Sequence, residues 1–205
     1  DLRNLSGLGR QTPGLALVTI LAAASMAGLP PTFGFVAKES VFAELLQLGA
    51  FDPLAVGAFA VAVIGSVLTV AYMARFIWGA FATKKSVPLC TIVHRESPSI
   101  LIAPAVFAAA TLIGGLAAPV LDRLLQATIA PATEAPEHLA LWHGLTPALG
   151  ASALVLVAGA VVAVALIRRR SSFPAVPERF SASHLYWLLT HGVDILAVRL
   201  TALTQ

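Results

Sequence analysis

Apolar residues run through most of the chain in long stretches, which short polar segments separate. Four of these stretches predict membrane-spanning segments, over residues 13–49, 54–81, 99–121 and 146–167. A helix needs about 20 mainly apolar residues to cross the hydrocarbon core of a bilayer. The pattern therefore predicts an all-α integral membrane protein that folds as a helical bundle.

The first stretch is interrupted in its middle. Two glycines and two prolines, followed by a Lys-Glu pair, form the interruption: Gly28, Pro30, Pro31, Gly34, Lys38 and Glu39. Proline removes a backbone donor and clashes with the preceding turn, so a helix must break or kink there. Within a bilayer, protein or a water-filled cavity has to cover such an opened backbone. We expect one discontinuous transmembrane helix over residues 13–49.

The distribution of basic residues favours a single crossing by this first stretch. Cytoplasmic loops of membrane proteins carry an excess of Lys and Arg. With one crossing, nine basic residues share one side and only Arg123 lies in the loops on the other side. With a hairpin, the split would be seven to three, which is less sharp. The nine residues are Arg3, Arg10, Lys84, Lys85, Arg95, Arg168, Arg169, Arg170 and Arg179.

The C-terminal segment has a different pattern. After a proline-flanked linker at residues 171–177, leucine and valine recur at helical spacing from Leu185 to Leu203, with Thr190, His191 and Asp194 on the opposite face. This spacing predicts an amphipathic helix. We expect a terminal amphipathic interfacial helix on the cytoplasmic side, lying at the membrane surface or against a partner.

Composition narrows the classes of function. The chain is 58% hydrophobic and only 11% charged, against about one quarter charged in soluble domains. Its net charge of +3 comes from basic residues in short loops, so we expect no nucleic-acid partner. The single cysteine, Cys90, excludes an internal disulfide and a cysteine metal cluster. We expect no metal site and no cofactor site.

Lys38 is the strongest candidate for chemistry. A lysine in a membrane cavity loses the hydration that favours its charged form, which suits it to taking up and releasing a proton. Glu39 and Glu44 are carboxylates that could act with it. Arg75 is predicted to be an interfacial anchor, with a role in an ion path as the second interpretation. The alternative for Lys38 is an ordinary lysine that extends its ammonium group to the membrane surface.

Several segments resemble a known family. Residues 1–8, 25–31, 34–39 and 72–76 resemble the later part of an antiporter-like module. The A subunit of Mrp-type multisubunit sodium/proton antiporters and the largest antiporter-like subunit of respiratory complex I share this module. Residues 139–144, and Lys-Glu where complex I more often has Lys-Asp, are more typical of the Mrp protein.

The resemblance implies a function and a division of the chain. Residues 1–170 would form the C-terminal part of the antiporter-like transmembrane module, and residues 171–205 a cytoplasmic linker and lateral helix. Lys38 would be the terminal proton-exchanging lysine of a hydrated path, near its outward exit, with Glu39 beside it. The family's earlier half-channel would lie upstream of Asp1, so we expect a segment of a longer protein, with a true mature N-terminus as the alternative.

The resemblance also implies a setting. The chain would be part of a secondary cation/proton antiporter subunit that exchanges Na⁺ for H⁺, a transporter component and not an enzyme, in the bacterial cell membrane. Its partners would be other subunits of a membrane complex, the lipid bilayer, Na⁺ and H⁺. Two alternatives stay open: a proton-pumping membrane-arm subunit of complex I or a membrane-bound hydrogenase, and a structural membrane scaffold.

Overall fold

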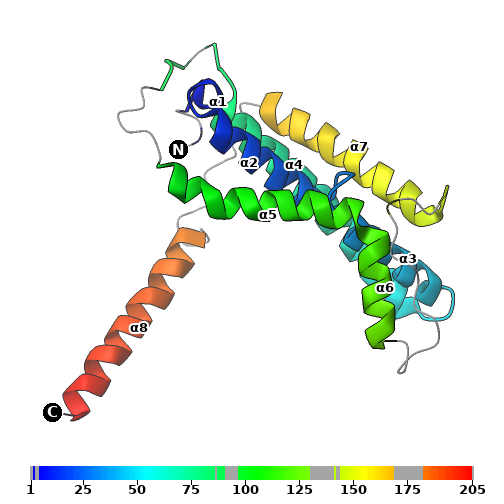
Figure 1. The fold of residues 1–205 in the computed structure, drawn as a ribbon. Coiled ribbons are helices and arrows are strands. Elements are labelled where there is room, and N and C mark those ends of the chain that lie inside the picture. Colours follow the sequence, from blue (N-terminus) through cyan, green and yellow to red (C-terminus); the bar gives the residue numbers. More distant parts are fainter. Residues whose placement is uncertain are drawn as a thin grey trace. The chain divides into compact units, whose positions relative to one another are not determined.

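The computed structural model describes residues 2, 5–85, 87–90, 97–129, 141, 144–168 and 182–204. Its described elements are all helices, and they belong to two units, residues 1–168 and 169–205 (Figure 1). The all-helical fold class predicted from the sequence is confirmed. The helices are α1 (Leu8–Gln11), α2 (Pro13–Ala27), α3 (Phe33–Gly49), α4 (Pro53–Phe81), α5 (Pro98–Leu116), α6 (Ala118–Ile129), α7 (Pro147–Arg168) and α8 (Ala182–Thr204).

Proline marks the start of several helices in the first unit. Pro13, Pro53 and Pro98 each open a helix, where the missing N–H would have had no partner in any case. Asp52 caps α4, and its side chain accepts a hydrogen bond of 2.8 Å from the backbone N–H of Leu54. These local signals explain why the helices begin where they do.

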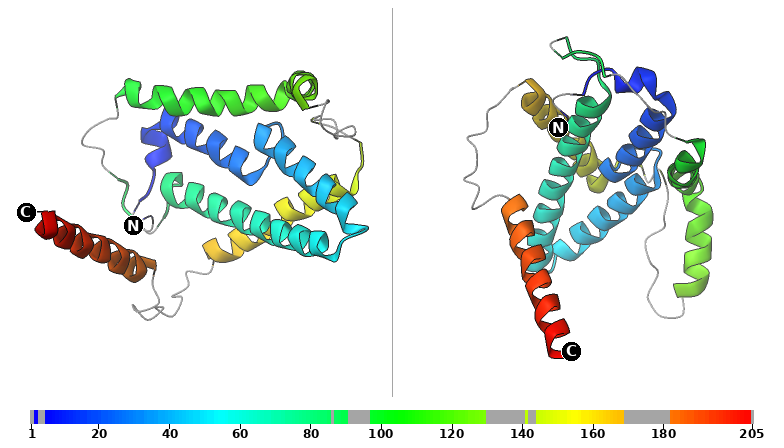
Figure 2. Two further views of the ribbon diagram at one scale, coloured as in Figure 1. Left: turned by 90° about the horizontal axis from the view of Figure 1, so that it is seen from below. Right: turned by 90° about the vertical axis from the view of Figure 1, so that its left-hand side faces the viewer.

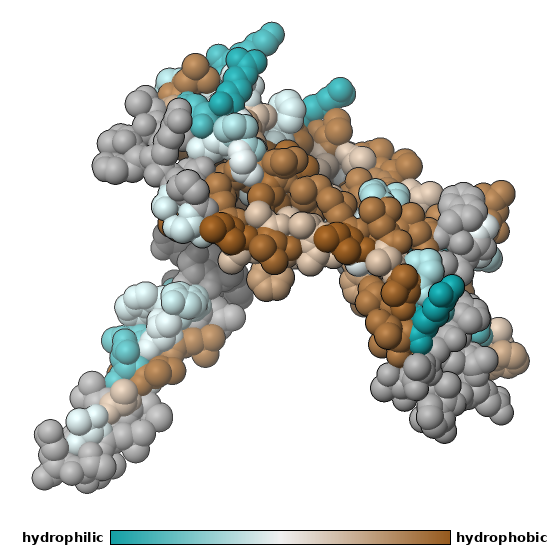
Figure 3. All heavy atoms as spheres, viewed as in Figure 1, coloured by the Kyte–Doolittle hydropathy of each residue, from teal (hydrophilic) through white to brown (hydrophobic). Residues whose placement is uncertain are grey.

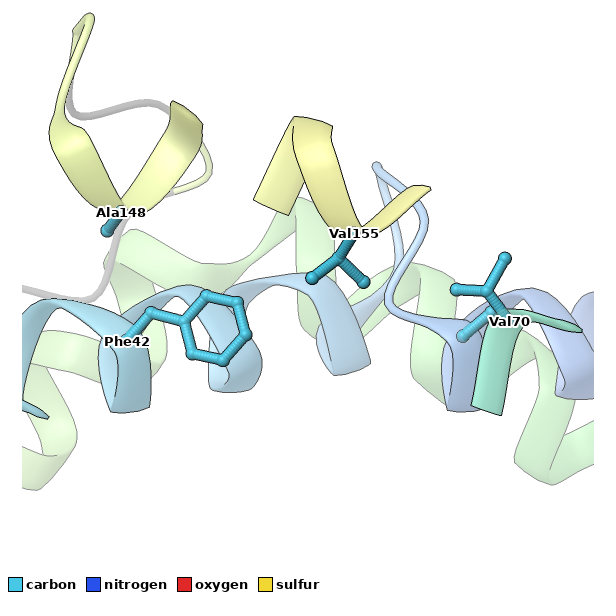
Figure 4. Packing of buried hydrophobic residues seen from close by; sticks show 5 residues of the cluster. Phe42, Val70, Ala148 and Val155 are labelled. Carbon is cyan, nitrogen blue, oxygen red and sulfur yellow. The ribbon is translucent and has the colours of Figure 1, made fainter. Parts of the chain in front are cut away.

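The first unit is built around α4. This helix packs against α2, α3 and α7, while α5 packs against α2 and α3 (Figures 1 and 2). Figure 4 shows Val155 of α7 between Phe42 of α3 and Val70 of α4, with Ala148 of α7 facing Phe42. Small residues allow this approach, because a Cβ added to Gly159 of α7 would lie only 2.5 Å from the Cβ of Val70. Close backbone packing of this kind is what holds helices together in lipid.

The predicted third span ends earlier than expected. The sequence predicted one segment over residues 99–121, but α5 ends at Leu116 and α6 starts at Ala118. Pro119 does not stop a helix here. It lies in the first turn of α6, where proline is tolerated. The chain that follows the predicted third segment therefore continues as a helix to Ile129.

Three helices are long and apolar enough to cross a membrane, among the residues that the structure describes. They cover Pro53–Phe81, Ser99–Leu116 and Pro147–Arg168. The face in Figure 3 shows apolar side chains along α5, with hydrophilic ones gathered toward the end where α1 lies. The first predicted stretch consists of two shorter helices, α2 and α3, separated by residues 28–32. That the pair crosses once, as a discontinuous helix, stays a prediction.

Lys84 joins the residues before α1 to the end of α4. The Lys84 ammonium donates hydrogen bonds to the carbonyl oxygens of Leu2 (2.6 Å), Leu5 (2.8 Å) and Gly79 (2.8 Å). The backbone N–H of Ser6 donates to the Cys90 sulfur at 3.3 Å. Lys84 is thus a structural contact between two segments in addition to being one of the basic loop residues.

The second unit contains α8. It forms at the place that the leucine spacing predicts, and the rings of Trp187 and His191 stack with centroids 4.9 Å apart. Tyr186, Leu188 and Leu189 are exposed. Its position at a membrane interface stays a prediction, and the predicted linker before it lies outside the described residues.

Candidate functional site at the helix break

The end of α2 has the geometry of a Schellman cap. Gly28 adopts a left-handed conformation with φ of 69° and ψ of 49°. The backbone N–H of Gly28 donates to the Ser25 carbonyl at 3.0 Å, and that of Leu29 donates to the Ala24 carbonyl at 2.9 Å. This motif satisfies two of the four carbonyls that a helix end leaves without intrahelical partners.

Lys38 binds two further carbonyls at the same helix end. Its ammonium nitrogen lies 3.3 Å from the carbonyl oxygen of Ala27 and 3.2 Å from that of Gly28, and donates a hydrogen bond to each. Because Lys38 belongs to α3, these two bonds span the break and join the second helix to the end of the first. The side chain is half-buried.

The turn between α2 and α3 is held by its own hydrogen bonds. The Thr32 hydroxyl and backbone N–H both donate to the Leu29 carbonyl, at 2.7 and 3.0 Å. The Thr32 carbonyl accepts a hydrogen bond from the N–H of Phe35 at 3.1 Å, and Thr32 is 2% exposed. The peptide bond between Pro30 and Pro31 is cis. The break is therefore a compact turn with defined contacts.

Two glycines let the chain segments of this turn approach closely. A Cβ on Gly28 would lie 2.7 Å from the ammonium nitrogen of Lys38. A Cβ on Gly34 would lie 1.9 Å from the Ser25 carbonyl oxygen, so the first turn of α3 packs directly on the last turn of α2. Both residues were predicted as parts of the break, and the structure gives each a specific steric reason.

Glu39 lies beside a cavity. The residue is 3% exposed, and it lines a hollow of about 340 Å³ between α3 and the start of α7. Polar side chains of Ser40, Gln47 and Thr146 share this lining. Lys38 and Glu39 thus have different roles in the packing although they are adjacent in sequence: the lysine binds the end of α2, and the buried glutamate is one of the residues that line the cavity.

The other two sequence candidates lie elsewhere. Glu44 is on α3 but exposed, and it is absent from the lining of the cavity beside Glu39. Arg75 is exposed on α4. The structure therefore places Lys38 against the residues of the break, with Glu39 next to it in α3, and it leaves Glu44 and Arg75 outside that group.

A larger hollow is chemically different. A groove of about 700 Å³ lies between α2, α4 and α7, and none of the described residues that line it has an ionisable side chain. Within the described residues there is also no group of three or more His, Cys, Asp or Glu side chains that could hold a metal ion. Of the two hollows, the smaller one is thus the one that has an ionisable residue, Glu39, in its lining.

Sequence reasoning missed the polar residues that line the cavity beside Glu39. Gln47 and Thr146 are more than 90 positions apart and meet only because α3 and α7 pack together. Thr146 did carry a local signal, since it precedes Pro147 at a helix start. Its hydroxyl accepts a hydrogen bond of 3.1 Å from the backbone N–H of Leu149.

Comparisons with known proteins bear on the identity of this arrangement. Residues 1–69 match the family described as NADH:quinone oxidoreductase/Mrp antiporter, TM. A solved structure of the Mrp complex from Dietzia sp. DQ12-45-1b covers 95% of the chain and 22% of the solved chain, at 32% sequence identity and with a TM-score of 0.61. The chain carries part of an antiporter-like module of the Mrp type.

Relatives from other bacteria agree with this Mrp-type module. The chain is 27% identical over 199 residues to the Na(+)/H(+) antiporter A1 subunit of Staphylococcus haemolyticus, covering 91% of the chain and 24% of that protein. It is 30% identical over 177 residues to the protein of the same name from Staphylococcus aureus strain Newman, covering 80% of the chain and 22% of that protein. The chain thus spans less than a quarter of the length of these relatives. With its apolar helices, the chain is a multi-pass part of a protein of the bacterial plasma membrane.

Proposed function

We propose that this chain is part of a secondary cation/proton antiporter subunit, in which it supplies the broken helix and the terminal lysine of the proton path. The observation that carries the proposal is the pair of hydrogen bonds from Lys38 to the carbonyls of Ala27 and Gly28 across the break. The names of the bacterial relatives support sodium as the exchanged cation.

The proposed cycle depends on the charge of Lys38. In its protonated form the ammonium group makes charge-assisted hydrogen bonds, which are about twice as strong as neutral ones. When Lys38 gives up its proton, the remaining amine holds the carbonyls of Ala27 and Gly28 more weakly. The protonation state of the lysine and the geometry of the break are therefore coupled.

Glu39 offers a route between the lysine and water. The cavity that it lines has a volume of about 340 Å³, enough for roughly ten water molecules at about 30 Å³ each. Neutral polar groups from Ser40, Gln47 and Thr146 line the way from Glu39 toward the C-terminal end of α3. In this proposal the carboxylate of Glu39 passes protons between Lys38 and water in the cavity.

The module works with partners. We expect other subunits of a membrane complex and the lipid bilayer around it, and a transporter role without enzymatic chemistry of its own. The α8 helix is the proposed contact on the cytoplasmic side, since several of its large apolar side chains are exposed within its own unit.

The test uses inside-out vesicles that contain the full assembled complex. Respiration loads a proton gradient, sodium is added, and a pH-sensitive dye reports the collapse of the gradient. Wild type and Lys85→Ala, which changes an exposed lysine, should respond to sodium, whereas Lys38→Ala should not. An equal response in Lys38→Ala and wild type would favour the scaffold alternative.

The second candidate is a proton-pumping arm of a redox enzyme. The matching family description, which names NADH:quinone oxidoreductase together with the Mrp antiporter, is the observation in its favour. A wild-type complex that ignores sodium but moves protons when NADH is supplied would establish this candidate and reject sodium exchange.

A further inference from the structure

Gly115 of α5 packs closely against the backbone of the turn between α2 and α3. A Cβ on Gly115 would lie 2.0 Å from the carbonyl oxygen of Pro31, 2.7 Å from the carbonyl carbon of Thr32 and 2.8 Å from the backbone nitrogen of Phe33. Non-bonded carbon and oxygen atoms do not approach this closely, so any side chain here would have to move backbone. Gly115 is buried.

The neighbouring glycine provides a comparison. A Cβ on Gly114 would lie 3.5 Å from the nearest atoms, which belong to the side chain of Phe33. That separation is ordinary van der Waals contact. Two adjacent glycines on one helix thus differ sharply, and only Gly115 depends on having no side chain.

The junction between α5 and α6 also contacts the start of α3. Ala118, the first residue of α6, is fully buried and packs with Phe35 and Val36 of α3. Gly115 therefore contacts the turn at Pro31, and Ala118 contacts the first turn of α3, which follows it directly in the chain. Lys38 follows Phe35 and Val36 within the next turn of the same helix.

We propose that Gly115 is a positioning residue for Lys38, because the close approach of α5 fixes the break and with it the carbonyls that the lysine binds. The turn is tied together from Leu29 to Phe35 by the hydrogen bonds of Thr32. A methyl group at Gly115 pushes the Pro31 carbonyl, and the tied turn moves with it. The distances from Lys38 to Ala27 and Gly28 then change. This inference rests on the proposed role of Lys38 in proton exchange.

The first experiment compares Gly115→Ala with Gly114→Ala in the full complex. Backbone hydrogen exchange of residues 28–35 should rise in Gly115→Ala and stay at the wild-type rate in Gly114→Ala. The pH profile of sodium-dependent exchange should shift by roughly one unit in Gly115→Ala. The reason is that weakening the hydrogen bonds of the Lys38 ammonium group changes its proton affinity by about that amount. A purely structural role would lower the amount of assembled complex and leave the pH profile in place.

A second variant covers the case in which Gly115→Ala does not assemble. The 3.5 Å separation between the Phe33 Cβ and a Cβ at Gly114 falls within the range of a disulfide. The double variant Phe33→Cys and Gly114→Cys, in a Cys90→Ser background, should form a crosslink on oxidation and keep the wild-type pH profile. Failure to crosslink, or a crosslink that stops transport until it is reduced, would overturn the proposal.

The outcomes separate this inference from the proposed function. Wild type without sodium-dependent exchange contradicts the proposed function, while hydrogen exchange and crosslinking still decide whether α5 fixes the break. If the wild type shows sodium-dependent exchange and Gly115→Ala matches it in backbone hydrogen exchange and in pH profile, the positioning role of Gly115 is rejected. The proposed function is then unaffected.

Discussion

A methyl group on Gly28 would lie 2.7 Å from the ammonium nitrogen of Lys38, so the lysine fills the space at the end of α2 that a side chain on Gly28 would need. Gly28 contributes both its left-handed backbone and one of the carbonyls that accept a hydrogen bond from the lysine. The same position thus ends a helix and receives the charged group of the next one.

Gly28→Ala should therefore disturb the site twice. A left-handed conformation costs a residue with a Cβ about 1–2 kcal/mol, and the new methyl group displaces the ammonium group of Lys38. We expect sodium-dependent exchange to fall by about tenfold or more, measured as dye response per assembled complex. Gly65→Ala on α4, where a Cβ would meet no atom within 4 Å, is the control. Full exchange in an assembled Gly28→Ala complex would show that Lys38 does not need this space.

Glu39 and Glu44 should respond differently to the same substitution. Glu39→Gln removes the titratable group beside the cavity, and we expect exchange to fall by about tenfold or more, since hydrogen bonds and charges at such a site are worth about 1.5–3 kcal/mol. Glu44→Gln changes an exposed carboxylate and should stay within about twofold of wild type. Initial rates in vesicles measure both, and equal rates for the two variants would remove Glu39 from the path.

Lys84→Met should loosen the segment that precedes α2. The carbonyls of Leu2, Leu5 and Gly79 lose the ammonium group that donates to them, and we expect a loss of about 2 kcal/mol in the free energy of unfolding. Limited proteolysis should cut residues 5–12 faster in this variant. Lys85→Met, which alters an exposed neighbour, should be cut at the wild-type rate. Matching digestion patterns in the two variants would contradict the structural role of Lys84.

Gly159→Ala should separate α4 from α7. A Cβ there would lie 2.5 Å from the Val70 Cβ and 3.0 Å from the Val67 carbonyl oxygen, and overpacking of this kind costs about 1–3 kcal/mol. The thermal midpoint of the detergent-purified complex should drop. Gly150→Ala, in the same helix but with open space around the added methyl group, should leave the midpoint unchanged or raise it slightly.

The sequence was sufficient for features that depend on local chemistry. Apolar stretches predicted the long helices, and Pro30 and Pro31 predicted a break because proline cannot continue a hydrogen-bonded turn. The predicted third segment, residues 99–121, extends past the end of α5 at Leu116 for a related reason that involves Pro119. Proline is tolerated in the first turn of a helix as well as just beyond the end of one, and hydropathy does not distinguish the two when α6 follows α5 after a single residue.

Features that depend on tertiary contact could not be predicted. The direction of the Lys38 side chain follows from how α3 is rotated against the end of α2, and spacing alone does not set that rotation. The approach of Gly115 to Pro31 joins positions more than 80 residues apart. The adjacent glycines Gly114 and Gly115 near a helix end were a usable signal, since glycine within a helix often marks close backbone packing.

The binding partners of Lys38 are peptide carbonyls, and this determines how the site would tolerate sequence change. The C-terminus of a helix carries roughly half a negative charge, from the summed dipoles of its peptide units. The electrostatic field at the lysine is therefore produced by the backbone of α2 and does not depend on which side chains that helix has. The exposed side chains of α2 could vary widely while the local potential stays the same, whereas its buried residues Ala16, Ala23 and Ala27 are held by packing. A scan that replaces the exposed side chains one at a time would therefore not find the site, although the backbone of α2 supplies its negative end.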